Sequence, residues 1–155
     1  MLNSYCLFGV SSAIALPIYL LSAQMAIADP VSQLLETRAC PECELNNANL
    51  VEAKLNGANL SLAKMRAADL RKANLLGANL MGAYLKDASF QDANLRWANF
   101  TNADLENVNF QGADLRGAKF NEALFKDVNV KKSTFCRTIM SDGTLNNRDC
   151  RLTGD

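Results

Sequence analysis

The stretch ANLLGANLMGA, residues 73–83, contains the rule that governs most of this chain. A large apolar residue returns at every fifth position, and a small residue precedes it by two positions. Asn or Asp usually stands directly before the large residue. The rule runs without interruption through residues 45–135, where the large positions are Leu45, Leu50, Leu55, Leu60, Met65, Leu70, Leu75, Leu80, Leu85, Phe90, Leu95, Phe100, Leu105, Phe110, Leu115, Phe120, Phe125, Val130 and Phe135.

A period of five fits neither regular secondary structure. A helix repeats at about 3.6 residues and would spread these residues around its axis. A strand alternates at two and would expose half of them. A polygonal coil buries them all if each unit of five forms one side and turns a corner. Four sides close a square of 20 residues, and coils about 4.8 Å apart predict a rod about 24 Å tall.

Within each unit we expect the large residue to point inward from the side and the small residue to point inward near the corner. Asn and Asp tolerate turn conformations, so we expect them in the neighbouring outward position. Asn59, Asn79 and Asn99 then stack in one column, which predicts hydrogen bonding at the corners.

The motif A-(N/D)-L-x-x resembles that of the pentapeptide repeat family. Residues 58–62 (ANLSL), 73–77 (ANLLG) and 113–117 (ADLRG) match it directly, and the resemblance covers about residues 43–138. It implies an all-β fold, a right-handed quadrilateral parallel β-helix of nearly five coils. The handedness comes from the family and not from the period.

Composition excludes several functional classes. The 155 residues carry 16 basic and 16 acidic side chains and no histidine, so the formal net charge is zero. A polyanion binder would carry a basic excess. Without histidine, the commonest general base and metal ligand is missing. Carboxylates are scattered and no phosphate-binding loop is present, so we expect no enzyme activity, no metal and no cofactor.

The first 28 residues have the pattern of an export signal. An almost wholly apolar run, residues 7–21, is followed by Ala26-Ile27-Ala28, and such a run before a small-x-small site is typical of a secretory signal peptide. We predict cleavage after Ala28, although residues 1–6 contain no Lys or Arg. A retained membrane anchor is the alternative. The resemblance to short, signal-bearing cyanobacterial family members implies the periplasm or the thylakoid lumen.

The segments on either side of the repeat are predicted caps, because a solenoid must cover its open ends. The expected organisation is a signal peptide (1–28), an N-terminal cap (29–42), the solenoid (43–138) and a C-terminal capping tail (139–155). Pro30 suits the first position of a short helix whose face holds Val31, Leu34 and Leu35. The tail contains an Asp142-Gly143 turn signal, and Met140 and Leu145 are its expected plugs.

Four cysteines follow the predicted cleavage site, and an even number in an exported chain suggests disulfides. Cys40 and Cys43 lie at one end of the rod and Cys136 and Cys150 at the other. Pairing across the ends is excluded, because a disulfide needs Cα atoms within about 7 Å. We predict a Cys136–Cys150 bond, worth roughly 3 kcal/mol in the chain-entropy model.

Cys40 and Cys43 are a possible second pair, or packed structural thiols. A four-cysteine zinc site fails on the same distance. The spacing of Cys40 and Cys43 also matches a redox C-x-x-C motif, but the βαβ context that supports that interpretation is absent.

Outward positions are the only places where this rod can carry a site. The outward apolar residues Leu62, Leu76, Met81 and Trp97 gather on two adjoining sides, with Arg96 and Arg116 at their rim. Such a group predicts a surface for a protein partner. The alternative is that Trp97 simply covers neighbouring glycines. The stack of Arg66, Lys86, Glu106 and Lys126 is expected to be a solvated charge ladder.

The sequence therefore predicts a non-enzymatic, exported, monomeric solenoid that offers a rigid surface to an unidentified protein. It predicts no nucleic-acid binding, and no membrane association after signal cleavage. Two alternatives stay open. One is a DNA mimic that protects topoisomerase, as the family resemblance allows, although neutral charge and an export signal disfavour it. The other is a thiol-redox role for Cys40 and Cys43.

Overall fold

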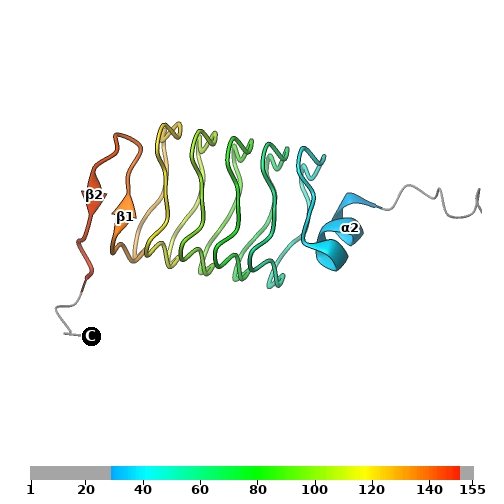
Figure 1. Cartoon of the computed structure of the whole chain (residues 1–155), viewed down its shortest axis with the longest axis horizontal. Coiled ribbons are helices and arrows are strands. Elements are labelled where there is room, and N and C mark those ends of the chain that lie inside the picture. Colours follow the sequence, from blue (N-terminus) through cyan, green and yellow to red (C-terminus); the bar gives the residue numbers. More distant parts are fainter. Residues whose placement is uncertain (1–28, 151–155) are drawn as a thin grey trace, which may run out of the picture.

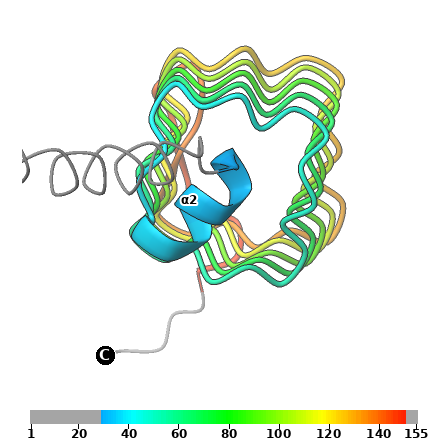
Figure 2. The same cartoon turned by 90° about the vertical axis from the view of Figure 1, so that its right-hand side faces the viewer.

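The computed structural model describes residues 29–150, so the predicted signal peptide and the last five residues of the tail lie outside the described residues. The chain winds into a rod of stacked coils (Figure 1) with a square outline when seen along its axis (Figure 2). Parallel β-bridges join residues 20 apart, from Ala39 with Asn59 to Lys119 with Ile139. The predicted coil of four pentapeptides is therefore present.

The large residue of every unit points into the rod. From Leu45 to Phe120 each of them is at most 1% exposed. Towards the C-terminal end the packing becomes aromatic: the rings of Phe90 and Phe110 stack at 5.2 Å between centroids, and those of Phe100 and Phe120 at 5.0 Å. Only near the last coil are two large residues, Phe125 and Val130, partly exposed. Each fully buried side chain contributes on the order of 2 kcal/mol.

The turn conformation lies at a different position from the expected one. The second residue after each large residue has a positive φ, from Glu42 to Arg137, and includes Gly57 (68°) and Trp97 (60°). In these turns, apart from those at Asp127 and Arg137, the N–H of the following residue donates to the carbonyl of the large one, as from Ala78 to Leu75 (3.0 Å). This is the pattern of a type II turn. None of these positions holds a β-branched residue, for which a positive φ is least tolerable.

Asn and Asp before the large residue thus do not adopt the turn conformation. They accept a hydrogen bond from the N–H two residues on, as Asn79 Oδ1 does from Met81 (3.2 Å). Their amides also form ladders between coils, as from Asn94 Nδ2 to Asn74 Oδ1 (3.1 Å). The expectation of corner hydrogen bonding holds for the Asn59 column, although its role is to accept from backbone N–H groups.

One unit illustrates how completely the backbone is bonded. Over residues 75–79, three N–H groups donate to carbonyls of neighbouring coils, one closes the turn, and the N–H of Leu76 donates to Asn74 Oδ1. Buried backbone N–H groups need hydrogen-bond partners. This unit shows that five residues can provide a partner for every backbone N–H although they contain no long strand.

Helix α2 (Pro30–Thr37) covers the N-terminal end (Figure 2). Asp29 caps it by accepting from the N–H of Ser32 (3.2 Å), and Pro30 begins it. Leu34 is fully buried and Val31 partly, but Leu35 is 49% exposed. The expected burial of Leu35 is therefore wrong. Because α2 lies over one corner of the square opening, only a narrow stripe of the helix faces the core.

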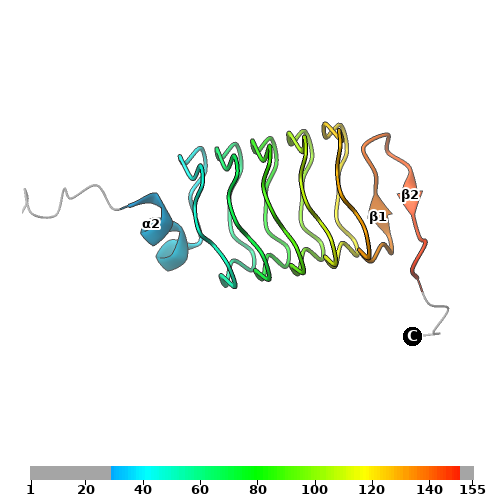
Figure 3. The same cartoon turned by 180° about the vertical axis from the view of Figure 1, so that it is seen from behind.

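At the other end the chain folds back as an antiparallel pair of β1 (Thr138–Ile139) and β2 (Leu145–Asn146), seen from behind in Figure 3. The turn between them contains Gly143 with a φ of 79°. Met140 packs against the core as expected, whereas Leu145 is 59% exposed and is not a plug.

Arg148 and Asp149 do the covering that Leu145 does not. The Arg148 guanidinium lies 4.8 Å from the centre of the Phe135 ring, and Asp149 accepts from the N–H of Phe135 (2.8 Å). A charged tail can bond the free backbone groups of the last coil, which a leucine cannot.

Replacement of Phe100 by Ala should destabilise the rod by about 3–4 kcal/mol, because it removes a ring that contacts other rings on several sides and leaves a cavity. Chemical denaturation followed by circular dichroism measures the loss. Tyr84→Ala is the control, since Tyr84 is 53% exposed. Equal losses in the two variants would contradict this account of the core.

Candidate protein-binding surface

Each side of the rod is named here by one of its inward leucines. The Leu75 side has Leu55, Leu75, Leu95 and Leu115 at its centre, and the Leu80 side follows it in the chain. The Leu85 side comes next, opposite the Leu75 side, and the Leu70 side completes the square. Outward side chains on each side come from the turn residues and from the residue before the leucine.

The predicted apolar residues occupy two separate corners. Leu76 and Trp97, 39% and 54% exposed, lie in turns of adjacent coils at the corner between the Leu75 and Leu80 sides. Leu62 and Met81, 45% and 43% exposed, share the next corner, where the Leu62 N–H donates to the Met81 carbonyl (2.9 Å). The asparagine column of Asn59, Asn79 and Asn99 runs between them.

Trp97 covers Gly117 of the next coil. A Cβ placed on Gly117 would lie 2.3 Å from Trp97 Cε3, so the indole occupies the space that a side chain would take. Leu62 lies over Gly82 in the same way, 2.7 Å from a would-be Cβ. For one face of the indole this supports the alternative interpretation, in which Trp97 covers a neighbouring glycine. The remainder of the indole is exposed to solvent and available for contact.

Sequence reasoning missed Tyr84 and Leu124, which are both 53% exposed. They stand directly before a large residue, the position assigned to polar hydrogen-bonding side chains. The available signal was an aromatic or aliphatic residue where most units have Asn or Asp. Tyr84 extends the Leu62 corner, since both line a groove of about 330 Å³ together with Glu42 and Lys64.

The two rim arginines differ in their partners. Arg116 is held by Asp114, with Nε to Oδ1 at 2.8 Å and Nη2 to Oδ2 at 2.5 Å. Burial raises the pKa of Asp114, but the hydrogen bonds from Arg116 and the charges of Arg116 and Arg96 outweigh burial, so the pKa is lowered. Within residues 29–150 Arg96 forms no ion pair of its own.

The Leu85 side carries charges that neutralise one another. Glu106 bridges Lys86 (2.7 Å) and Lys126 (2.6 Å), and hydrogen bonds from Lys126 and Lys86 lower its pKa to about 2. Arg66 pairs with Asp87 at 3.5 Å. The expected ladder is present, and its charged groups already have partners.

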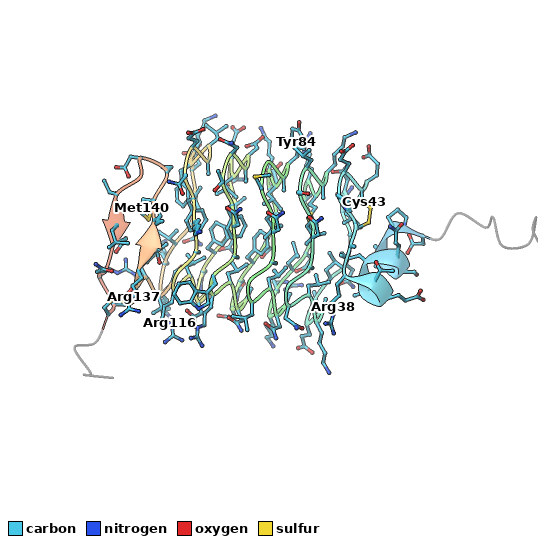
Figure 4. All side chains as sticks on the ribbon, viewed as in Figure 1. Arg38, Cys43, Tyr84, Arg116, Arg137 and Met140 are labelled. Atoms are coloured by element: carbon cyan, nitrogen blue, oxygen red, sulfur yellow. A yellow bond between two sulfur atoms is a disulfide. The ribbon has the colours of Figure 1, made fainter. Side chains whose placement is uncertain are left out.

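The cysteines lie at the two ends of the rod. Cys136 and Cys150 have Cα atoms 4.8 Å apart, and Cys40 and Cys43 5.4 Å apart, both within disulfide range. Cys40 is fully buried in phase with the large residues, and Cys43 is partly buried beside α2 (Figure 4). Among the described residues no group of three or more His, Cys, Asp or Glu side chains could hold a metal ion.

These features define a class of protein, the β-solenoid. Its interior is filled with apolar side chains, and its exposed side chains lie on the outer sides. The family described as Pentapeptide repeats matches the chain in eight copies over residues 43–80, 63–102, 78–117 and 103–142. The chain therefore belongs to the pentapeptide repeat family. Solved members of this family imply a right-handed winding of the coil.

Two solved structures are similar over most of the described rod. HetL, a pentapeptide repeat protein involved in heterocyst differentiation regulation from the cyanobacterium Nostoc sp. strain PCC 7120, is 29% identical with a TM-score of 0.58; the match covers 70% of this chain and 62% of HetL. A pentapeptide repeat protein from the Arabidopsis thaliana thylakoid lumen is 25% identical with a TM-score of 0.52, covering 74% and 73%.

The chain thus spans less than two thirds of the length of HetL. A search of curated proteins by sequence gives no match. Within residues 29–150 there is also no helix of the length and apolarity that crossing a membrane requires.

Gly117 and Gly77 form a matched pair that tests the packing of Trp97. Both have positive φ (72° and 66°), so the left-handed backbone costs about 1–2 kcal/mol when Ala stands at either position. Only Gly117→Ala also collides with Trp97, whereas a Cβ at Gly77 meets nothing within 4 Å. We expect Gly117→Ala to lower the free energy of unfolding further and to shift Trp fluorescence. Equal effects would show that Trp97 does not rest on Gly117.

Proposed function

We propose that this chain is a non-enzymatic, exported solenoid that presents a rigid side to another protein. The observation that carries the proposal is the exposed pair of Leu76 and Trp97 beside Arg96 and Arg116. These side chains project from a backbone whose donors are bonded between coils, so the surface loses little conformational entropy on binding. Arg and Trp are the residue types that contribute most to protein interfaces.

Membership of a family whose members are generally structural or interaction proteins supports a non-enzymatic role. The proposal adds that the chain works as a monomer, without a cofactor and without nucleic acid. A DNA mimic is the weaker alternative, because it needs an acidic surface, and Arg96 and Arg116 lie on the candidate side instead. A thiol-redox role for Cys40 and Cys43 is also weaker, because Cys40 is fully buried and the βαβ context of a redox C-x-x-C motif is absent.

Export is the second part of the proposal. Support comes from the apolar run and the Ala26-Ile27-Ala28 site, and from cysteine pairs at disulfide distance at both ends. The similarity to a protein of the plant thylakoid lumen agrees with the periplasm or the thylakoid lumen as destination. Oxidised Cys40–Cys43 and Cys136–Cys150 pairs belong to this proposal.

Site-specific cross-linking tests the binding surface. A photoreactive amino acid in place of Leu76, Met81 or Trp97 should capture a discrete protein in the producing cells. The same group in place of Lys86 or Lys126 should capture little, because the basic groups of the Leu85 side are paired within the rod and do not attract a partner. Equal capture from both sets of positions would refute a defined partner surface.

Intact mass of the native protein tests export and oxidation together. We expect the mature chain to begin at Asp29 and to gain four hydrogen atoms on reduction, two for each disulfide. An N-terminus at Met1 would refute cleavage. A gain of only two hydrogens would leave one pair as free thiols, and alkylation before reduction would identify which pair.

A further inference from the structure

Charge is unevenly distributed around this neutral chain. Four basic residues of the Leu75 side (Lys54, Arg96, Arg116 and Arg137) are accompanied by one acidic residue, Asp114, so this side carries a net charge of +3. Arg38, at the C-terminal end of α2, lies along the same edge of the rod as Arg116 and Arg137 (Figure 4). Tyr84 marks the opposite edge in that view.

The basic groups of this side also lack internal partners. Within residues 29–150, Lys54, Arg96 and Arg137 form no ion pair, and only Arg116 is bound, by Asp114. On the opposite Leu85 side all four basic residues are paired, including Arg66 with Asp87. The positive potential of the Leu75 side is therefore available to a carboxylate from outside.

An apolar strip runs along the corner where this basic side meets the Leu80 side. Gly57 and Gly77 leave the corner bare, since a Cβ on either would meet nothing within 4 Å. The next coil places Trp97 at the same corner, and Leu76 projects beside it, 39% exposed. A side chain from a partner can lie over the glycines and contact the indole without displacing any group of the rod.

The spacing between coils sets the length of the partner segment that this side can bind. At about 4.8 Å per coil, the basic groups from Lys54 to Arg137 extend over roughly 19 Å, the length of an extended peptide of about six residues. Arg96 and Arg137, the two arginines of this side left unpaired within the described rod, are two coils apart and can receive two carboxylates about 10 Å apart.

We propose that the Leu75 side binds an extended acidic segment of a partner protein, with carboxylates on Lys54, Arg96 and Arg137 and an apolar side chain on Trp97. This inference rests on the proposed protein-binding function and names its partner class. Nucleic acid fits less well, because Asp114 keeps a negative charge in the middle of the side and the strip along its corner is apolar.

Trp97 is the only tryptophan of the chain and reports on this side directly. The probe is a synthetic peptide of about nine residues in which Glu and Asp alternate with Leu and Phe. Added to the mature protein, it should shift Trp97 emission saturably, and the affinity should fall as salt rises. The same peptide with Lys in place of its acids should produce no shift.

Variants assign the effect to this side. Arg96→Glu and, independently, Arg137→Glu should each weaken binding about tenfold. Arg66→Glu is the matched control for Arg96→Glu: it makes the same charge change at the same turn position on the opposite side and should leave affinity unchanged. Circular dichroism confirms folding of each variant. Loss of affinity in all three variants alike, or in none, would overturn the proposal.

A short DNA duplex and vesicles of phosphatidylglycerol and phosphatidylcholine are measured in parallel. Tighter binding of either one than of the acidic peptide would overturn the proposal in favour of that partner. Cross-linking from position 76 in the Arg96→Glu background separates the two levels of inference. Undiminished capture of a protein would refute the acidic partner and leave the proposed function standing, whereas absence of capture without that substitution would refute the function.

Discussion

Hydrogen bonding between coils is the constraint on which the whole structure depends. A turn every five residues prevents long strands from forming, so each unit must satisfy its backbone donors locally. It does so with carbonyls of neighbouring coils, one turn bond and, in many units, the Asn or Asp side chain that precedes the large residue. Once these bonds are made, the inward residues have no freedom of direction, and Leu75 and Phe100 are buried because the backbone faces them inward.

The same constraint means that the repeat units of this chain are alike at their inward positions and differ at their outward positions. Inward positions hold large apolar residues or small ones, including Ser133 and Thr138, whose hydroxyl groups donate to backbone carbonyls. The turn residues and many residues before the large one instead include Arg, Trp, Glu and Lys. Chemistry can therefore differ from side to side on an unchanged scaffold. The paired charges around Glu106 and the unpaired ones around Arg96 show two such sides of one rod.

Most of the interior could be predicted from sequence, because the period of five has only one compact solution. The position of the turn could not be predicted, because two positions of each unit contain residues that are common in turns: the Asn or Asp before the large residue and the second residue after it. The second of these has the left-handed conformation, although it includes Leu62 and Trp97. The outward apolar residues were predicted on two adjoining sides, and they lie at two successive corners of the rod; Tyr84, which joins one of these corners, was not predicted. Leu35 and Leu145 failed because end caps are irregular and obey no repeat.

The two cysteine pairs lie at the two ends of the rod, where a stack of coils is least stable. Each interior coil has neighbours above and below, but a terminal coil has only one, so thermal opening proceeds inward from the tips. A covalent clasp at Cys40–Cys43 and another at Cys136–Cys150 would oppose this fraying where it begins. In an oxidising compartment the rod would then unfold chiefly in one global step. A reducing agent would restore stepwise unfolding from the ends.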